Sequence, residues 1–285
     1  MPTSSVAALN VYPVKSCAGI GQEEASVAPR GIVASTPSGN IGDREWMIVD
    51  RDGTFVTQRE YPRLALIGTA LESGALVLRA PGGARLALSL EPCRGATREV
   101  VVWRSRVRAH DAGDEAAAWL SSALGADLRL VRFDPSDRRL CNPDFAGDSG
   151  AHTAFADGYP LLVIAESSLA DLNARLVTAG TPALPMNRFR PNLVLAGLDP
   201  FAEDHIDTLA IDGITIKLVK PCTRCQITTT DQDSGQVGAE PLATLQGFRM
   251  NERLGGVTFG VNAIVVAGEG RTLAKGMEVE VAYAF

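Results

Sequence analysis

The stretch from Lys220 to Gly235 reads KPCTRCQITTTDQDSG, and within it Cys222 and Cys225 lie on either side of Arg224. A nearby positive charge lowers the pKa of a thiol, so an arginine beside a cysteine favours the thiolate, which is both a nucleophile and a metal ligand. The threonines that follow favour β-structure, and the Asp-rich end at Gly235 is typical of a turn. The stretch therefore predicts a strand or loop that presents a thiolate and then turns sharply.

Four interpretations of the cysteine pair compete. A structural zinc ion needs about four ligands, but the remaining cysteines and the histidines are scattered singly: Cys17, Cys93, Cys141, His110, His152 and His205. A C-x-x-C dithiol usually opens a helix after a strand, whereas β-branched residues and a turn follow this one. The other two interpretations are a pair of half-buried thiols in a strand, and one cysteine that ligates a cofactor bringing its own ligands. The spacing of the cysteines alone does not decide between these interpretations.

The composition limits the class of protein. With 285 residues, 46% of them hydrophobic, and with 28 glycines and 16 prolines, we expect a turn-rich globule of one large domain or two. A net charge of −6 argues against the usual basic nucleic-acid surface. Five cysteines, mostly isolated, suggest free thiols in a reducing compartment, and we expect a cytoplasmic protein. No apolar run suits a signal peptide, an anchor or a membrane span, so we expect no membrane contact.

Short apolar segments separated by turns predict a mainly β chain with few helices. The expected strands are residues 6–11, 46–50, 54–57, 68–71, 76–79, 86–89, 99–103, 107–109, 128–133, 161–165, 192–196, 209–211, 214–219, 262–267 and 278–284. Their spacing, with Asp-Gly pairs between 50 and 54 and between 211 and 214, favours hairpins in a β-barrel or sandwich.

Two helices and two irregular segments complete the predicted order. Residues 115–124 are expected to form a helix, with Asp114 as N-cap and Gly125 at its end. Ser168 and Asp171 have capping-box spacing, and the leucines at 169, 172 and 176 form a helical stripe. Residues 29–42 are expected to be a loop. Residues 134–158 are polar and turn-rich, and we expect a mobile crossing that forms one rim of the site.

Several motifs in register resemble the MOSC domain family. They are C-x-R-C-x-x-T-T-x-D-x-x-S-G from Cys222, EPLATLQGFR (240–249), MNRFRPN (186–192), LNVYPVKSCAGI (9–20) and GDREWMIVD (42–50). The likeness is greatest to reductases of the amidoxime-reducing type and to bacterial reductases of N-hydroxylated bases. It implies a MOSC N-terminal β-barrel over residues 1–133 and a MOSC β-barrel domain over residues 134–285.

The resemblance also implies a molybdenum cofactor, in which a pterin dithiolene holds the metal and one protein cysteine completes the sulfur ligands. It assigns that cysteine to Cys225, with Cys222 as a neighbour, and a soft thiolate suits such a metal. Anions call for cations and backbone N–H groups, and the matching positions are Lys15, Ser16, Arg44, Arg190, Thr223 and Arg224. Asn192 is expected to orient its loop, and Asn262 to lie near the pterin. Gly158 and Tyr159 stand where the family has hydroxyl-bearing residues, and the path from Gly31 to Asp43 is longer than in the family.

The implied activity is a two-electron reduction that removes oxygen from an N-hydroxylated small molecule, such as an amidoxime or an N-hydroxylated base. Because the sequence has no cysteine after Cys225 for an iron–sulfur domain, we expect a separate electron donor, which would be ferredoxin-like, cytochrome b5-like or a flavoprotein reductase. The alternatives are a non-catalytic molybdopterin or sulfur carrier, and a thiol oxidoreductase that uses both cysteines. Pyridoxal phosphate binding is a further expectation that accompanies the resemblance.

Overall fold

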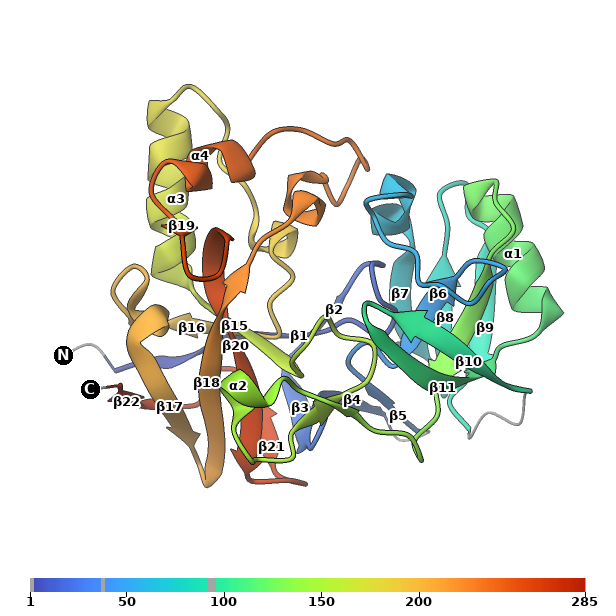
Figure 1. Ribbon diagram of the computed structural model, residues 1–285, viewed down its shortest axis with the longest axis horizontal. Helices are drawn as coiled ribbons and strands as arrows, with labels where there is room; N and C mark the ends of the chain where they lie inside the picture. The colour runs from blue at the N-terminus through green and yellow to red at the C-terminus, as the bar shows by residue number, and fades with distance from the viewer. Residues whose placement is uncertain (1–2, 37–38, 92–95, 285) are drawn as a thin grey trace.

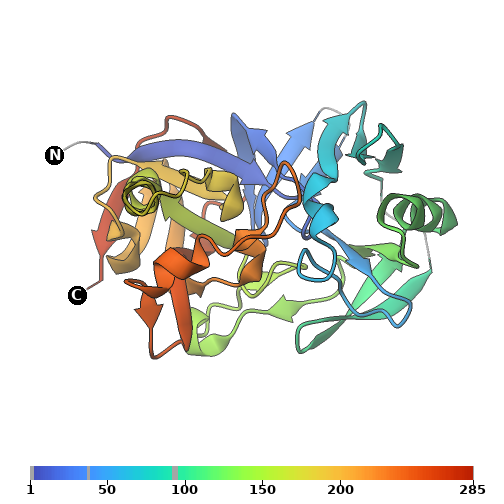
Figure 2. The ribbon, with the colours of Figure 1, turned by 90° about the horizontal axis from the view of Figure 1, so that it is seen from above.

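The computed structural model describes residues 3–36, 39–91 and 96–284, and it confirms a mainly β architecture. Figure 1 shows two parts side by side. The left part holds both termini and the helices α3 (Glu166–Thr178) and α4 (Leu242–Gln246), and the right part holds α1 (Asp114–Leu124). Figure 2 shows the same two parts from above, with strands running across the boundary between them.

The largest sheet has nine strands and uses both ends of the chain. Its order is β2 (Ile20–Gln22), β1 (Ser5–Val11), β16 (Leu193–Ala196), β15 (Leu161–Ala165), β20 (Gly256–Ala267), β18 (Ile214–Thr223), β17 (Ile206–Ile211) and β22 (Glu280–Tyr283), with β19 (Met250–Asn251) paired to β20. β15 and β16 are parallel, and β1 pairs with β16 in the antiparallel sense. The first strand of the chain therefore belongs to the sheet of its second half.

Smaller sheets make up the rest of the molecule. One has the order β21 (Thr272–Ala274), β3 (Glu24–Ala28), β4 (Gly31–Thr36) and β5 (Gly39–Gly42). Another has the order β10 (Thr97–Val102), β11 (Ser105–Asp111), β12 (Arg129–Phe133) and β6 (Trp46–Val49), while β7 (Gly68–Glu72), β8 (Ala75–Arg79) and β9 (Arg85–Ser89) form a third. β13 (Arg139–Leu140) pairs with β14 (His152–Thr153), and α2 (Pro143–Ala146) lies between them in the chain. The domain division at residues 133 and 134 stays a prediction, since β1 and β21 each pair across it.

The buried apolar side chains explain why the two parts stay together. One continuous cluster includes Val11 and Leu64 as well as Leu130, Leu209 and Ile216, so it runs through both parts. A second cluster lies under α3, where Leu172 and Leu176 are fully buried on the predicted stripe. In that cluster the rings of Phe189 and Phe259 stack with their centroids 4.2 Å apart. This stack backs the loop that carries the MNRFRPN motif.

One predicted loop was wrong. Residues 29–42 were expected to be a loop, but they contain the β4–β5 hairpin, because Ile32, Ala34 and Ile41 alternate into the core.

The predicted hairpin around residues 50–54 is present in a shorter form. Val49 and Phe55 form an antiparallel bridge after β6, although residues 54–57 form no regular strand. The carboxylate of Asp50 accepts hydrogen bonds from the backbone N–H groups of Asp52 and Thr54, so its side chain stabilises the turn.

Gly125 ends α1 as predicted, but the two predicted N-caps were wrong. The N-cap of α1 is Gly113 rather than Asp114. α3 begins at Glu166, so Ser168 lies inside the helix and does not cap it. The Ser168 hydroxyl instead donates to the buried carboxylate of Glu203 and accepts from the backbone N–H of Phe201. A tertiary partner satisfies this hydroxyl, which is why the local capping pattern misled.

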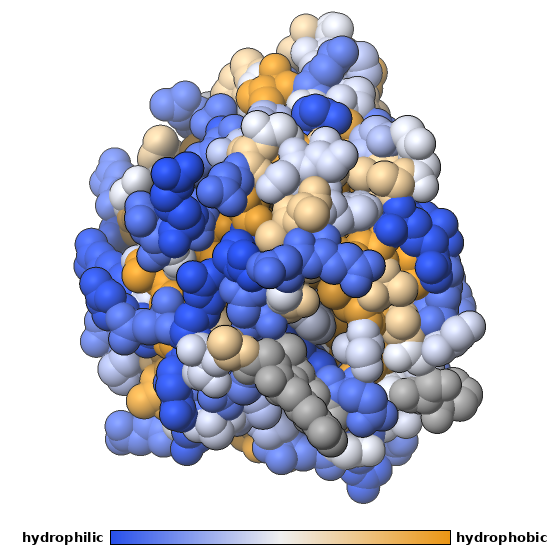
Figure 3. All heavy atoms as spheres, turned by 90° about the vertical axis from the view of Figure 1, so that its right-hand side faces the viewer, coloured by the Kyte–Doolittle hydropathy of each residue, from blue (hydrophilic) through white to orange (hydrophobic). Residues whose placement is uncertain are grey.

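One end of the molecule shows no large apolar area on its surface (Figure 3). Figure 3 shows the end of the molecule formed by the right-hand part, where hydrophilic residues predominate and hydrophobic ones form separated spots. Within residues 3–36, 39–91 and 96–284, no helix combines the length and apolar character needed to span a membrane.

Candidate functional site

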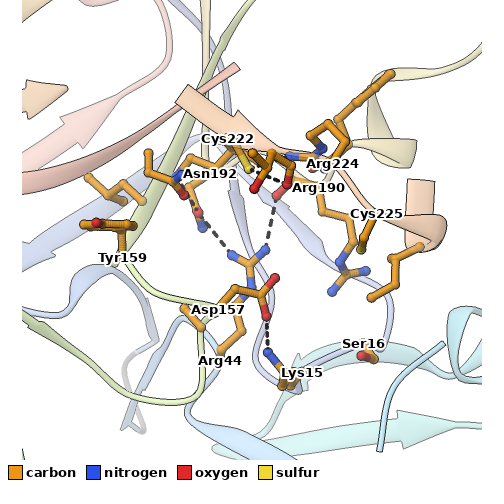
Figure 4. Close-up of a pocket in the computed structure, with 17 residues that line it drawn as sticks. Lys15, Ser16, Arg44, Asp157, Tyr159, Arg190, Asn192, Cys222, Arg224 and Cys225 are labelled. Carbon is orange, nitrogen blue, oxygen red and sulfur yellow. Dashed lines mark hydrogen bonds and ion pairs between the residues drawn. The ribbon is translucent and has the colours of Figure 1, made fainter. Parts of the chain in front are cut away.

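A pocket between the two parts collects the residues singled out by the sequence motifs. Every predicted contact residue except Gly158 lines it, although the residues come from distant segments: Lys15, Ser16, Arg44, Tyr159, Arg190, Asn192, Thr223, Arg224, Cys225 and Asn262. Figure 4 labels most of these side chains and shows them around one space, from different strands and loops. Gly158 lies between Asp157 and Tyr159, and only these two of the three line the pocket.

Three of the lining residues have a backbone conformation that side chains rarely adopt. Ser16, Arg44 and Arg190 have φ values of 68°, 46° and 57°. Non-glycine residues in this region carry a steric cost and persist where surrounding contacts hold them in place. All three lie in turns that leave or enter strands, so the turns aim their side chains or N–H groups at one space.

Asn192 is the hub that joins these turns. Its side-chain oxygen accepts hydrogen bonds from Arg44 at 3.0 Å and from the backbone of Leu162 at 3.2 Å. Its amide nitrogen donates to the carboxylate of Asp43 at 2.8 Å and to the carbonyl of Asn10 at 3.1 Å. Because every hydrogen-bonding capacity of this buried amide is used by protein, Asn192 positions the site rather than facing a ligand.

Arg44 and Arg190 are neighbouring arginines with opposite electrostatic surroundings. Arg44 donates to Asp43 at 2.6 Å. It also donates to the carbonyl of Arg190 at 3.2 Å (Figure 4). Burial, the largest single influence, lowers the pKa of Arg44, but the charges of Asp43, Tyr12 and Asp157 together outweigh it and the net shift is upward. Arg190 is only 8% exposed, and its Nη2 has no hydrogen-bond partner in the described part of the chain. Burial, together with the charge of Arg44, lowers the pKa of Arg190 to about 10.

An aromatic ring links the two arginines. The guanidinium carbons of Arg44 and Arg190 each lie 4.3 Å from the centroid of the Tyr12 ring. Such contacts are attractive when the cation is desolvated, yet they neutralise no charge. Arg190 is thus a held but unpaired cation, which is the arrangement that an anionic ligand would complete.

The two thiols have different arginine partners. Within the C-T-R-C motif, Arg224 donates to the sulfur of Cys222 at 3.0 Å and to the carbonyl of Phe189 at 2.7 Å. The sulfur of Cys225 instead accepts from Arg59 at 3.3 Å. Cys225 follows the end of β18 and precedes a 3-10 helix (Gln226–Thr229), so the thiol stands at a strand end as predicted.

Arg59 is the site residue that sequence reasoning missed. It lies 166 residues from Cys225 along the chain, in an irregular segment without a recognised motif. Its turn is fixed by its neighbours, since Gln58 donates to the carbonyl of Ser16 at 2.7 Å and Glu60 accepts from Thr57. The buried polar residues Thr57 and Gln58, each 1% exposed, are a signal that only the structure reveals.

On the opposite side of the pocket, Lys15 is almost fully enclosed. Its ammonium group donates to Asp157 at 2.5 Å and to the carbonyl of Phe155 at 2.9 Å. Burial lowers the pKa of Lys15, although Asp157 opposes this shift. The carboxylate of Asp157 also accepts from the indole N–H of Trp103 at 3.1 Å. Asp157 and Trp103 were not singled out from the sequence.

Tyr159 and Asn262 line the side of the pocket near β20. The hydroxyl of Tyr159 is buried and has no partner among the described residues. Burial, with smaller contributions from Cys141 and Asp144, raises the pKa of Tyr159 to about 12. Asn262 donates to the carbonyl of Lys220 at 3.2 Å, and this bond joins β20 to the strand that leads to the cysteines.

The donor set fits an anionic cofactor with a single cysteine ligand. Among the described residues no group of three or more His, Cys, Asp and Glu side chains could hold a metal ion, which disfavours a structural zinc site. Lys15 and Arg44 are paired with carboxylates, whereas Arg59, Arg190 and Arg224 have no carboxylate within 4.0 Å in the described ranges. Buried nitrogens of Arg190 and Arg224 remain without partners there. A phosphate-bearing ligand would satisfy both nitrogens, and the Cys225 thiol would supply a soft metal ligand.

Comparisons with known proteins agree with the motifs. The model of the MOSC N-terminal beta barrel domain matches residues 3–127, and that of the MOSC domain matches residues 150–280. Mitochondrial amidoxime reducing component 2 of Bos taurus is 36% identical over 258 residues, which cover 86% of this chain and 72% of that protein. Mitochondrial amidoxime-reducing component 1 of Homo sapiens is 37% identical, with the same coverage. Molybdenum cofactor sulfurase of Oryza sativa subsp. japonica is 34% identical and covers 93% of this chain, but the match spans 33% of that protein.

Proposed function

The chain belongs to the MOSC family, and from that premise we propose that it is a molybdenum-cofactor-dependent oxidoreductase that reduces N-hydroxylated compounds. The relatives named as amidoxime reducing components align with both parts of the chain, and the match covers most of each protein. The proposal adds to this likeness a specific observation, which is the cluster of unpaired arginines around a partly exposed thiol.

That cluster carries the proposal. An ordinary protein surface pairs or hydrates its cations, whereas here Arg190 is buried beside Arg44 with a free Nη2. Desolvating a cation without a partner is costly, so we infer that the fold tolerates this cost because a ligand anion offsets it. Arg224 and Arg59 extend the same positive region to both cysteine sulfurs.

In this proposal each residue has a separate task. Cys225 would hold the metal, while Arg190, Arg224, Lys15 and the turn at Ser16 would hold the phosphate-bearing pterin. Arg44 and Asn192 would keep the loops in register, since Arg44 donates to Asp43, Asn192 and the carbonyl of Arg190 and the Asn192 amide is fully used by protein. Thr223, Tyr159 and Asn262 would shape the pocket wall. When bound, the cofactor supplies the two-electron redox chemistry, and the protein supplies binding, orientation and electrostatics.

Electrons would come from a separate donor protein, which is ferredoxin-like, cytochrome b5-like or a flavoprotein reductase. Cytoplasmic location, the absence of membrane contact and pyridoxal phosphate binding stay predictions from the sequence.

A turnover experiment tests the proposal. Protein made in a host that synthesises the cofactor, and shown to contain molybdenum, is mixed with benzamidoxime or 6-hydroxylaminopurine. With NADH alone we expect almost no product, because no electron carrier is present. With a chemically reduced viologen dye we expect the amidine or the amine. Loaded protein that oxidises no reduced dye with any of several N-hydroxylated compounds would refute the reductase assignment.

A non-catalytic molybdopterin or sulfur carrier is the alternative, and the likeness to the rice sulfurase over 93% of this chain favours keeping it. A carrier would keep the unpaired arginines and Cys225 but would need no substrate space. Loaded protein that releases its cofactor to an apo-enzyme, and shows no turnover with reduced dye, would support this alternative.

A further inference from the structure

Trp103 occupies an unusual position at the edge of the pocket. Val102 pairs with Ser105, so Trp103 and Arg104 form the two-residue turn between β10 and β11. Turns of this length favour glycine or asparagine wherever φ is positive, but Trp103 has a φ of 56°. A bulky residue in this region is an outlier that persists only if other contacts fix it.

The residues that fix Trp103 lie in or beside the pocket. The indole N–H donates to Asp157 at 3.1 Å, and the guanidinium carbon of Arg59 lies 4.7 Å from the centroid of the indole. The ring of Phe55 packs against it at 5.0 Å and an angle of 52°. Trp103 is therefore held in one orientation by residues that themselves touch Lys15 and the sulfur of Cys225.

Despite these contacts, Trp103 is 40% exposed. A single exposed tryptophan on a surface needs no explanation. Trp103, however, contacts Arg59, which donates to the Cys225 sulfur, and it donates directly to Asp157, whose side chain lines the pocket. Arg59, Lys15 and Phe55 cover part of the ring. The part that stays exposed, in a fixed orientation beside the pocket, is suited to stack on a flat, conjugated group, and such stacking is tolerant of the exact ring system.

We propose that Trp103 is a specificity-determining residue, on whose exposed ring the planar group of an aryl amidoxime or of an N-hydroxylated purine stacks. The inference rests on the proposed function, since it assumes that N-hydroxylated compounds are the substrates. It adds that flat, conjugated members of that class are preferred over compact aliphatic ones, and that the preference arises in the β10–β11 turn.

The indole has two separable roles, and two variants distinguish them. Trp103→Phe keeps an aromatic ring but removes the N–H that donates to Asp157. Trp103→Leu keeps apolar volume but removes the ring. If stacking selects the substrate, the leucine variant loses the preference and the phenylalanine variant keeps most of it. If Trp103 only anchors Asp157, both variants change alike.

The first measurement is the ratio of kcat/KM for benzamidoxime to kcat/KM for acetamidoxime, with molybdenum-loaded protein and reduced viologen dye. We expect Trp103→Leu to lower this ratio roughly 10- to 100-fold, the range of a lost aromatic stacking contact, and Trp103→Phe to lower it less than about fivefold. An unchanged ratio in Trp103→Leu overturns the inference. Wild-type protein that turns over neither compound refutes the proposed function instead.

The second measurement does not depend on turnover. Benzamidine, a flat amidine that this reaction cannot reduce further, is titrated into loaded protein while tryptophan fluorescence is followed. We expect saturable quenching in wild type and in Trp119→Phe, because Trp119 lies on α1 and packs against the core. We expect that quenching to be lost in Trp103→Phe, since the reporting indole is gone. Equal quenching in wild type and Trp103→Phe would show that benzamidine does not bind at this ring and would overturn the inference.

Discussion

Replacing Arg190 by methionine should make the cofactor-free protein more stable while weakening cofactor binding. The pKa of Arg190 falls from the ordinary 12.5 to about 10 in the folded protein, chiefly because the guanidinium is buried. One pKa unit corresponds to about 1.4 kcal/mol, so keeping this side chain charged costs roughly 3 kcal/mol. Its contact with the Tyr12 ring returns about 0.5–2 kcal/mol. Arg190→Met should therefore raise the free energy of unfolding by about 1–2 kcal/mol.

The sign of this effect follows from the direction of the shift. Folding lowers the pKa of the Arg190 guanidinium, so the folded state disfavours the charged form of this side chain. The cost is complete at every pH below about 10 and disappears only above the ordinary value of 12.5. Near neutral pH, the increase in the free energy of unfolding on replacing Arg190 should therefore not depend on small changes of pH.

The assay compares two variants in two forms of the protein. Urea denaturation of cofactor-free protein gives the change in stability, and molybdenum analysis of protein from a cofactor-competent host gives occupancy. Arg44→Met is the matched control: it leaves the buried Asp43 without its cation, which should cost about 3 kcal/mol or more. We expect opposite signs for the two variants and lower occupancy in both. The reasoning is refuted if cofactor-free Arg190→Met loses more than about 1 kcal/mol, or if it is fully loaded.

Three further predictions concern other residues. Cys225→Ser should abolish turnover and deplete molybdenum, because a hydroxyl is a poor replacement for a thiolate, whereas Cys222→Ser should be milder; equal loss of activity in both with metal retained would favour a dithiol mechanism. Asn192→Ala should lower the free energy of unfolding by about 2–4 kcal/mol in urea titrations, because it removes one donor to the buried Asp43 and the side-chain partner of two backbone groups in the interior; a loss below about 1 kcal/mol would contradict its role as a hub. Burial raises the pKa of Glu203 above the ordinary 4.5, so its contribution to stability is complete below pH 4.5 and is lost as the pH rises through the folded value; Glu203→Gln should flatten this decline, and an unchanged slope between pH 4 and 7 would contradict it.

Much of the fold could be predicted because its signals are local. The hairpins β7–β8 and β17–β18 follow from alternating apolar residues on either side of turns. The position of Cys225 at a strand end follows from β-branched residues and a turn sequence in the same short stretch. The predicted caps at Asp114 and Ser168 failed for the converse reason, since a small polar residue near a helix start can be satisfied by a partner that the local sequence does not contain.

The sequence by itself determined many of the residues that gather at the pocket, because most of them lie in recognisable motifs, and all the predicted contact residues but Gly158 line the same space. It did not indicate Asp157 or Arg59. Only the tertiary structure decided how the pocket residues are paired. Arg224, adjacent to Cys225 in the chain, contacts Cys222, and the arginine at the Cys225 sulfur is Arg59. Likewise β1 joins the sheet of the second half of the chain. Periodicity and turn chemistry act over a few residues, whereas the Arg59–Cys225 contact and the β1–β16 pairing join segments more than a hundred residues apart, and their geometry depends on how the sheets pack.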